Sequence, residues 1–215
     1  GQPVYSVGLA DWSSADNAPA LARAILWCVD NGMQVINISA GSTSHATSAL
    51  LAPICARAAS AGIIIVAAQH NDGLVSYPAH LPSVIGVRGA KIYGDRTYHY
   101  CPGQSIECVA RGDAQRLRWG SGRQVLIGGN SFAAPRITGI VARLKEQHPQ
   151  AGVDEIRGLL QQGAARVIEP ESPSQNSYQQ APALPQVSRV ALYPYTKEMH
   201  ALVRFQDLLP FRLSG

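Results

Sequence analysis

Short apolar runs alternate with amphipathic helical stretches through the first 165 residues, and this alternation limits the possible fold more than any other feature. The runs are rich in Val and Ile and too apolar for a sheet with one face in water, which is typical of parallel strands buried between helices. The sequence therefore predicts an α/β fold with a parallel sheet between two helical layers. The predicted strands are 4–9, 35–39, 63–68 and 84–87, with shorter ones at 106–110 and 124–127; the predicted helices are 17–31, 48–61, 132–147 and 153–162.

Composition excludes several classes of function. The net charge is +4, but the basic residues are scattered, and only Arg116, Arg118 and Arg123 lie close together. We interpret that group as a solvated loop and expect no nucleic-acid partner. No 18-residue apolar run occurs, so no membrane partner is expected. No signal peptide is visible either, which leaves the location open and favours the cytoplasm slightly.

Cofactor sites are not indicated. The four cysteines form no Cys-x-x-Cys pair, which argues against zinc. No loop gathers the carboxylates that calcium requires, and nothing suggests a nucleotide. We therefore expect neither a cofactor nor a bound metal.

The composition changes near the C-terminus. Residues 169–186 hold four of the 14 prolines together with Ser, Gln and Asn. This composition is typical of a linker. The sequence therefore predicts a first domain at 1–166, a linker at 167–187, and a C-terminal extension or the start of a second domain at 188–215.

Polar, glycine-rich segments follow three of the predicted strands, at 39–42, 69–73 and 128–131. Sites in parallel sheets lie beyond the carboxyl ends of the strands, so we expect chemistry there. Ser131 follows two glycines and begins a long helix. Free N–H groups at a helix start stabilise negative charge on an alkoxide or an oxyanion. The plainer alternative is a serine that only caps the helix.

The sequence around Ser131 resembles a known motif. Residues 129–139 read Gly-Asn-Ser-Phe-Ala-Ala-Pro-x-x-Thr-Gly, which is similar to the subtilase serine motif Gly-Thr-Ser-Met-Ala-x-Pro-x-Val-x-Gly. Asn130 in place of Thr and Phe132 in place of Met are the departures. Four more stretches resemble the subtilisin-like serine proteases in the family's order, at 24–41, 61–73, 77–87 and 153–162. The resemblance implies a three-layer, subtilisin-like α/β fold.

The resemblance also implies roles for two residues. Ser131 matches the nucleophile. Asn71 matches the side-chain donor of the oxyanion hole, where the Ser131 backbone N–H is its partner. Outside this context, Asn71 would be a turn residue in the turn-forming sequence Asn-Asp-Gly.

Substrate-binding residues follow from the same resemblance. Ser39, Ala40 and Gly41 match the strand edge that pairs with an extended substrate. Ala68 and Gln69 match the opposite wall of the pocket, and Ser76 lies near its base. His70 stands where the family usually has glycine, and its neighbours do not match those of the catalytic histidine.

The family's other two catalytic residues have no counterpart in this chain. None of the six histidines lies in a His-Gly-Thr-His sequence, and neither Asp-Ser-Gly nor Asp-Thr-Gly occurs. A serine hydroxyl needs an adjacent base. We therefore expect the fold to be incomplete on its N-terminal side and the Asp and His to belong to a second chain or fragment. A cleaved protease, a split or truncated chain and a degenerate subtilase remain the alternatives.

The predicted function is a serine endopeptidase fragment or subunit that cleaves polypeptides through an acyl-enzyme on Ser131. The main alternative is an inactive subtilase-like protein that binds peptides or acts as a scaffold. An unrelated α/β binding domain would require the order of the motifs to be a coincidence.

Overall fold

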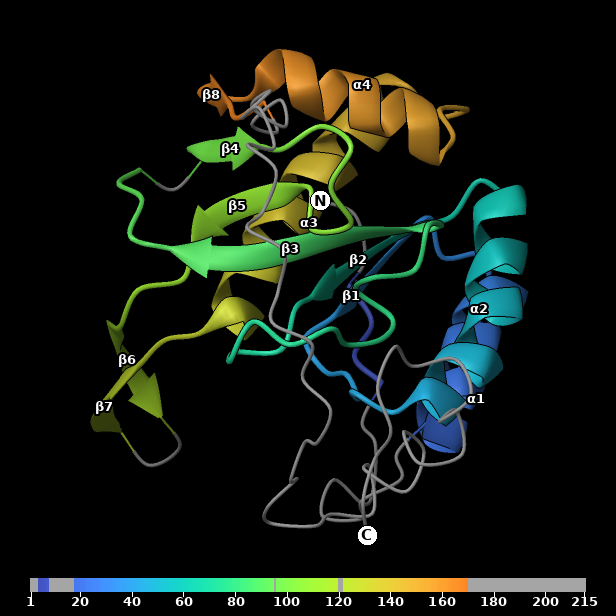
Figure 1. The fold of residues 1–215 in the computed structure, drawn as a ribbon, viewed down its shortest axis with the longest axis horizontal. Coiled ribbons are helices and arrows are strands. Elements are labelled where there is room, and N and C mark those ends of the chain that lie inside the picture. Colours follow the sequence, from blue (N-terminus) through green and yellow to red (C-terminus); the bar gives the residue numbers. More distant parts are fainter. Residues whose placement is uncertain (1–3, 8–17, 95, 120–121, 170–215) are drawn as a thin grey trace, which may run out of the picture. The chain divides into compact units, whose positions relative to one another are not determined.

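The computed structural model describes residues 4–7, 18–94, 96–119 and 122–169 (Figure 1). All of them belong to one unit, Gly1–Pro170. The predicted linker beyond residue 169 and the predicted extension at 188–215 lie outside the described residues. The predicted domain boundaries therefore stay predictions.

A six-stranded sheet forms the centre of this unit (Figure 1). Four neighbouring strands are parallel, and a fifth, β4, joins them antiparallel through β5. A separate antiparallel hairpin of β6 and β7 leads to the third helix. The sheet order is β1 (Val35–Ile38), β2 (Ile64–Ala68), β3 (Val84–Ala90), β5 (Cys108–Arg111), β4 (Tyr98–Tyr100) and β8 (Arg166–Val167), and the hairpin strands are β6 (Gln115–Trp119) and β7 (Arg123–Ile127).

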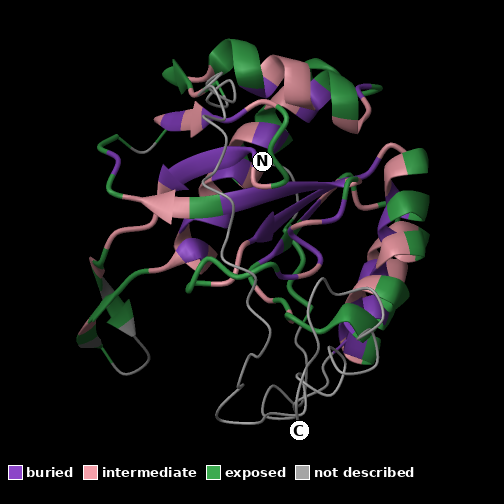
Figure 2. Ribbon diagram, viewed as in Figure 1, coloured by how far each residue is buried: buried purple, intermediate pink, exposed green. Residues whose placement is uncertain are grey.

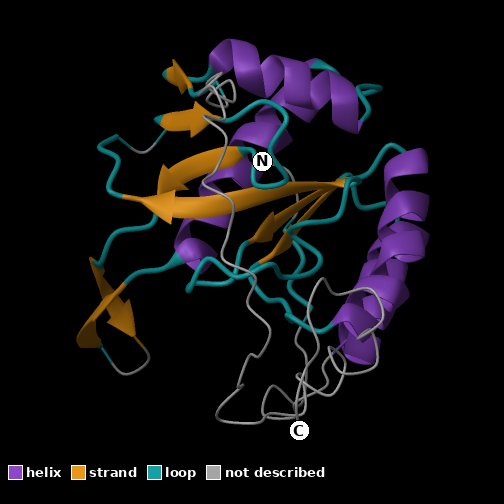
Figure 3. Ribbon diagram, viewed as in Figure 1, coloured by secondary structure: helices purple, strands orange, loops and turns teal. Residues whose placement is uncertain are grey.

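Two pairs of helices cover the sheet (Figure 3), and the buried residues lie between the layers (Figure 2). Strand β2 is buried on both faces, as its composition predicts. Ile65 and Ala67 pack in the cluster of α1 (Ala18–Asp30) and α2 (His45–Ser60). Ile64 and Val66 pack in the cluster of α3 (Asn130–Gln147) and α4 (Val153–Gly163). The predicted three-layer α/β fold is confirmed.

The predicted buried strands and the helices exist, with small shifts at their ends. Helix α2 begins at His45, earlier than predicted, because the Ser44 side chain accepts the Ala46 N–H and caps the helix there. The strand predicted at 4–9 is wrong for residues 4–7, the part that is described. Their side chains are exposed and belong to no strand, so this apolar run lacks the burial that a core strand requires. The predicted cap at Asn17 lies outside the described residues.

Lys145 fixes the C-terminal part of α3. Its side chain is buried, and its ammonium donates to the carbonyl oxygens of Gly62, Pro149 and Ala151 at 3.2, 2.8 and 2.9 Å. No carboxylate takes part in these contacts. The lysine therefore satisfies three carbonyl groups where α3 approaches the turns before β2 and α4.

Arg157 links α4 to the sheet. Its Nε lies 3.0 Å from each carboxylate oxygen of the buried Glu107, and its Nη2 donates to the carbonyls of Pro82 and Val84. The Tyr100 hydroxyl also donates to Glu107. Burial raises the pKa of Glu107, although Arg157 and Tyr100 act in the opposite direction.

Among the described residues, no helix is long and apolar enough to cross a membrane.

Candidate active site

The loops after β1 and β2 meet the start of α3 at the carboxyl ends of the parallel strands. The Ser39 hydroxyl donates to the carbonyl oxygen of Ser131 at 3.2 Å. The Asn71 side chain accepts the Asn130 N–H at 2.9 Å. These contacts bring together three segments that the sequence places about 30 and 60 residues apart, as strand ends of a parallel sheet require.

Ser131 is the second residue of α3 and is partly exposed. Gly129 precedes the helix with φ 139°, a conformation that favours glycine. Neither the hydroxyl nor the backbone N–H of Ser131 makes a hydrogen bond to any part of the chain that the structure describes. Both groups are therefore available to a ligand at the positive end of the helix dipole.

Asn71 lies on the exposed turn after β2, directly against the start of α3. Its Oδ1 is occupied by the Asn130 N–H, whereas its Nδ2 donates to none of the described residues. A Cβ at Gly129 would lie 2.9 Å from Asn71 Oδ1, so only glycine permits this approach. The arrangement leaves a free amide donor on a side chain that contacts the residue before Ser131, and a free donor is what an oxyanion site requires.

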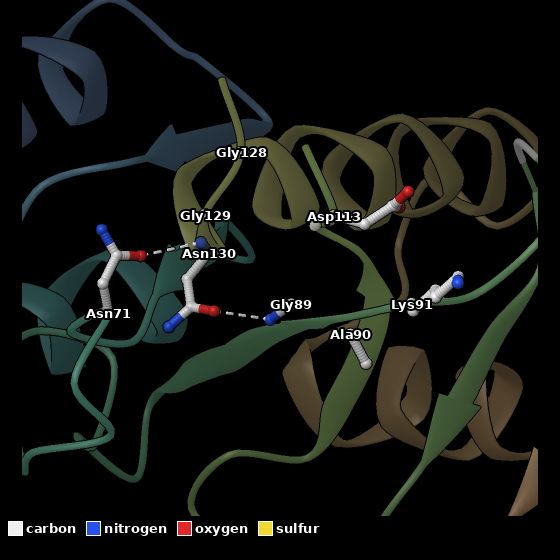
Figure 4. A pocket seen from close by; sticks show the side chains of 9 residues that line it. Asn71, Gly89, Ala90, Lys91, Asp113, Gly128, Gly129 and Asn130 are labelled. Atoms are coloured by element: carbon white, nitrogen blue, oxygen red, sulfur yellow. Dashed lines mark hydrogen bonds between the residues drawn. The ribbon is translucent and has the colours of Figure 1, made fainter. Parts of the chain in front are cut away.

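Asn130 makes more hydrogen bonds in this region than either Ser131 or Asn71, and Figure 4 shows two of them, to Asn71 and to Gly89. Its side-chain oxygen accepts the Gly89 N–H from β3, and its side-chain nitrogen donates to the carbonyls of Gln69 and His70. The sequence interpretation treated Asn130 only as a departure from the serine motif. The signal in the sequence that could have indicated this role is a polar amide side chain at the start of the helix, directly after two glycines.

The segment predicted to pair with substrate follows β1. Ser39 and Gly41 are exposed and Ala40 is half-buried. Ser42 exchanges two backbone hydrogen bonds with Tyr77, at 3.0 and 2.8 Å, which holds this segment antiparallel to the one before Pro78. The edge at 39–41 thus lies beside Ser131 and is open to solvent.

The residues predicted to line the opposite wall and the base lie around the turn after β2. Ala68 ends β2 and is buried, and the Gln69 side chain donates to the carbonyl of Gly73. Ser76 is buried, and its hydroxyl accepts the His70 N–H at 2.9 Å. Both polar side chains therefore serve to hold the turn closed on itself. Their proposed roles toward substrate remain predictions.

A cavity of about 440 Å³ opens on the β3 and β5 side of the same residues (Figure 4). Asp113 lines it and pairs with Arg111 at 2.9 Å. Figure 4 shows Lys91 and Asp113 on one side of this cavity and Asn71 on the other. The lining residues are Asn71, Gly89, Ala90, Lys91, Gly112, Asp113, Gly128, Gly129 and Asn130.

No base contacts Ser131 within the described residues. His70, the neighbour of Asn71, instead lies against Asp72, whose backbone N–H donates to its Nδ1 at 3.3 Å. His80 bonds to the backbone of Ser76. No group of three or more His, Cys, Asp or Glu side chains suited to a metal ion occurs in the part of the chain that the structure describes.

Comparison with known proteins identifies the family. The sequence model of the subtilase family, peptidase S8, matches residues 3–187, which is most of the chain. The chain belongs to the subtilase family. The match includes the motif around Ser131 and the turn that carries Asn71.

Similar subtilases are found among curated bacterial proteases. The chain is 32% identical over 169 residues to the thermostable alkaline protease of Halalkalibacterium halodurans, which covers 78% of this chain and 46% of that protein. It is 27% identical over 170 residues to subtilisin DY of Bacillus licheniformis, covering 76% of this chain and 61% of that protein. The chain thus spans about half the length of the curated relatives it matches.

Solved subtilase structures agree with the fold. The S41 psychrophilic protease superposes with a TM-score of 0.55 at 27% identity, over 69% of this chain and 55% of that one. Sphericase superposes with a TM-score of 0.52 at 25% identity, over 69% and 54%. Sequence comparison and structural superposition therefore agree that this chain has a subtilisin-like fold.

Proposed function

We propose that this subtilase chain is the serine-bearing part of an endopeptidase that cleaves polypeptides through an acyl-enzyme on Ser131. One observation supports this proposal most directly. The start of α3 lies against Asn71 through the 2.9 Å hydrogen bond from the Asn130 N–H, so the amide of Asn71 contacts the residue that directly precedes Ser131. The family assignment agrees with this chemistry.

In the proposed reaction, the Ser131 Oγ attacks the carbonyl carbon of the scissile peptide bond and loses its proton to a base. The carbonyl oxygen becomes an oxyanion, which accepts hydrogen bonds from Asn71 Nδ2 and the Ser131 N–H. The base then gives the proton to the leaving amine as the C–N bond breaks. Water hydrolyses the resulting ester and releases Ser131.

The extended backbone of the substrate would pair with the edge at Ser39, Ala40 and Gly41, because these residues are at least partly exposed beside Ser131. Ala68, Gln69 and Ser76 would then surround the side chain before the scissile bond. Since Gln69 and Ser76 already hydrogen-bond within their own turn, we expect a pocket without a strong preference for charged residues.

We propose that a segment outside this chain supplies the catalytic Asp and His. The Ser131 hydroxyl has no hydrogen-bond partner among the described residues, and none of the six histidines in the sequence lies in a His-Gly-Thr-His motif, which supports a base from another segment. In the described sheet, β1 pairs only with β2, so its other edge offers N–H and C=O groups to a further strand. A segment added at this edge would lie next to the loop at Ser39.

The same lack of a base supports the second candidate, an inactive subtilase that only binds peptides or acts as a scaffold. Removing a member of the catalytic triad costs up to about 10⁶ in kcat in subtilisin itself. A chain without the catalytic Asp and His would therefore bind substrate but hardly cleave it. The two candidates differ in whether Ser131 reacts in the native assembly.

A fluorophosphonate probe applied to the native assembly distinguishes them. Every chain that copurifies would first be identified by intact mass and N-terminal sequencing. We expect labelling of the natural protein and of Ser60→Ala, an exposed serine at the end of α2, and none of Ser131→Ala. If an assembly that contains the Asp and the His-Gly-Thr-His motif does not label at Ser131, the scaffold is the correct interpretation.

A further inference from the structure

The Asn130 side chain joins three segments at the edge of the sheet. Its Oδ1 accepts the Gly89 N–H at 2.7 Å, and its Nδ2 donates to the carbonyls of Gln69 and His70, both at 3.0 Å. Its own backbone N–H donates to Asn71 Oδ1. Only 9% of the residue is exposed, so both amide protons and the amide oxygen are used inside the protein.

These bonds are the hydrogen bonds that connect the turn after β2 to the start of α3 in the described structure. The other hydrogen bonds of this segment lie within the turn or run to β3: the Gln69 side chain bonds to Gly73, the His70 N–H bonds to Ser76, and the Gln69 N–H donates to the Val87 carbonyl. Without the Asn130 side chain, the turn would keep its internal shape but lose two of its three hydrogen bonds to the helix that carries Ser131.

We propose that Asn130 is a positioning residue that sets the place of Asn71 relative to Ser131. It fixes the carbonyls of the two residues before Asn71, while its backbone N–H occupies Asn71 Oδ1 and so leaves Nδ2 to face the ligand. The Gly89 N–H holds the Asn130 amide in the orientation that this requires, because it occupies Oδ1 and leaves Nδ2 toward the turn. The proposal rests on the proposed function in that Asn71 then donates to the oxyanion.

Two substitutions distinguish the contribution of the acceptor Oδ1 from that of the donor Nδ2. Asn130→Asp keeps the length and the acceptor for the Gly89 N–H, but it replaces the donor with an oxygen that faces two carbonyl oxygens. Asn130→Ser shortens the side chain, so a single hydroxyl replaces the amide. Thr138→Val, on the same helix as Asn130, is the matched control: it removes the 2.9 Å hydrogen bonds from the Thr138 hydroxyl to Asn37 of β1 and to the Ala134 carbonyl, and it does not contact the turn after β2.

We call the three hydrogen bonds of the Asn130 side chain, to Gly89, Gln69 and His70, the Asn130 clamp. Hydrogen–deuterium exchange of the purified chain tests this clamp without requiring catalysis. With Asn130→Asp we expect exchange of the amides in residues 69–73 to rise on the order of tenfold or more, since two hydrogen bonds to the turn are lost. The Gly89 amide should remain protected from exchange in Asn130→Asp, whereas its exchange rate should rise in Asn130→Ser. If Asn130→Asp fails to fold, Asn130→Ser alone decides the question.

Two results would overturn the proposal. In one, the variants leave exchange of 69–73 within about twofold of Thr138→Val. In the other, they accelerate exchange equally throughout the described core, which would mean a general loss of stability rather than a local one.

Labelling of Ser131 in the native assembly then connects the clamp to the chemistry. We expect Asn130→Asp to lower the fluorophosphonate labelling rate by at least tenfold, and Thr138→Val to leave it within about twofold of the natural rate. If the variant loosens the turn but labels at the natural rate, positioning of Asn71 by Asn130 is wrong. If the natural assembly does not label at all, the proposed function fails, and the exchange experiment still decides whether the clamp exists.

Discussion

Asn71 has one free amide donor and contacts the residue before Ser131, and under the proposed function this donor should matter more in the transition state than in the bound substrate. In the active assembly we expect Asn71→Ala to lower kcat by about 10²–10³, the range measured for such a donor in a subtilisin, and to change KM little. Steady-state kinetics with a peptide substrate measure both. Asn31→Ala, an exposed asparagine at the end of α1, is the control. Equal loss in the two variants would contradict the role.

Lys145 should contribute to stability through its three carbonyl partners rather than through an ion pair. Replacing it with Met leaves these carbonyls without a donor, which we expect to lower the free energy of unfolding by about 3 kcal/mol. Urea denaturation measures the change. Lys91→Met, at an exposed lysine, should cost less than about 0.5 kcal/mol. Similar losses in both variants would show that the buried contacts do not matter.

At the level of single residues, the sequence predicted that Ser131 and Asn71 lie at the same edge of the sheet, but it did not predict the hydrogen bonds of Asn130 that connect their segments. The glycines and the serine of the motif, and the asparagine after β2, were sufficient to expect Ser131 and Asn71 at one sheet edge. Asn130 could not be assigned in the same way, because its importance depends on the carbonyls of Gln69 and His70 pointing toward it. That is a property of the folded backbone, which no spacing in the sequence specifies.

Between elements, Arg157 and Glu107 connect α4 to the sheet through a buried ion pair. Arg157→Leu leaves the Glu107 carboxylate buried without its cation, and we expect a loss of about 3–5 kcal/mol in the free energy of unfolding at neutral pH. Chemical denaturation of the single variant and of Arg157→Leu with Glu107→Leu measures it.

The double variant is the control for this pair. It should recover most of the loss, since replacing both charged partners by apolar side chains removes the unpaired charge. In the single variant, the loss should also shrink as the pH falls, because burial raises the pKa of Glu107 and its neutral form needs no cation. A double variant that is as unstable as the single one would contradict this account.

The success of prediction differs among the elements for a physical reason. Strand β2 and the first part of β3, at 84–87, are apolar on both faces and were predicted from that pattern alone. Strands β4 and β8 are short, and β6 alternates polar and apolar residues, so tertiary pairing rather than local sequence determines them. The strand expected at 4–9 shows the opposite error, an apolar run whose described part is not buried.

For the whole domain, buried tyrosines should make stability depend on alkaline pH. Burial raises the pKa of Tyr98 from 10.0 to about 12, and its hydroxyl donates to the carbonyl of Leu160. The folded protein thus keeps a proton that the unfolded chain loses. The resulting stability is complete below about pH 10 and is lost as the pH rises toward 12.

The measurement is the free energy of unfolding in urea between about pH 8 and 11. We expect a decrease above pH 10, with a total of up to about 2 kcal/mol from Tyr98 as the pH approaches 12. Tyr98→Phe should have a shallower decrease. Because burial also raises the pKa of Tyr100, part of the slope should remain in that variant. A slope that Tyr98→Phe does not change would assign the effect to other groups.

Helix α3 is fixed at both ends, by the Asn130 amide at its start and by the Lys145 ammonium near its end. Between them it packs on four strands, and its 18 residues span about 27 Å. A rod anchored in this way cannot tilt without breaking one of its anchors. Heating should therefore abolish reactivity at Ser131 and the helical circular dichroism signal in a single step, and no softened, partly active form should precede unfolding.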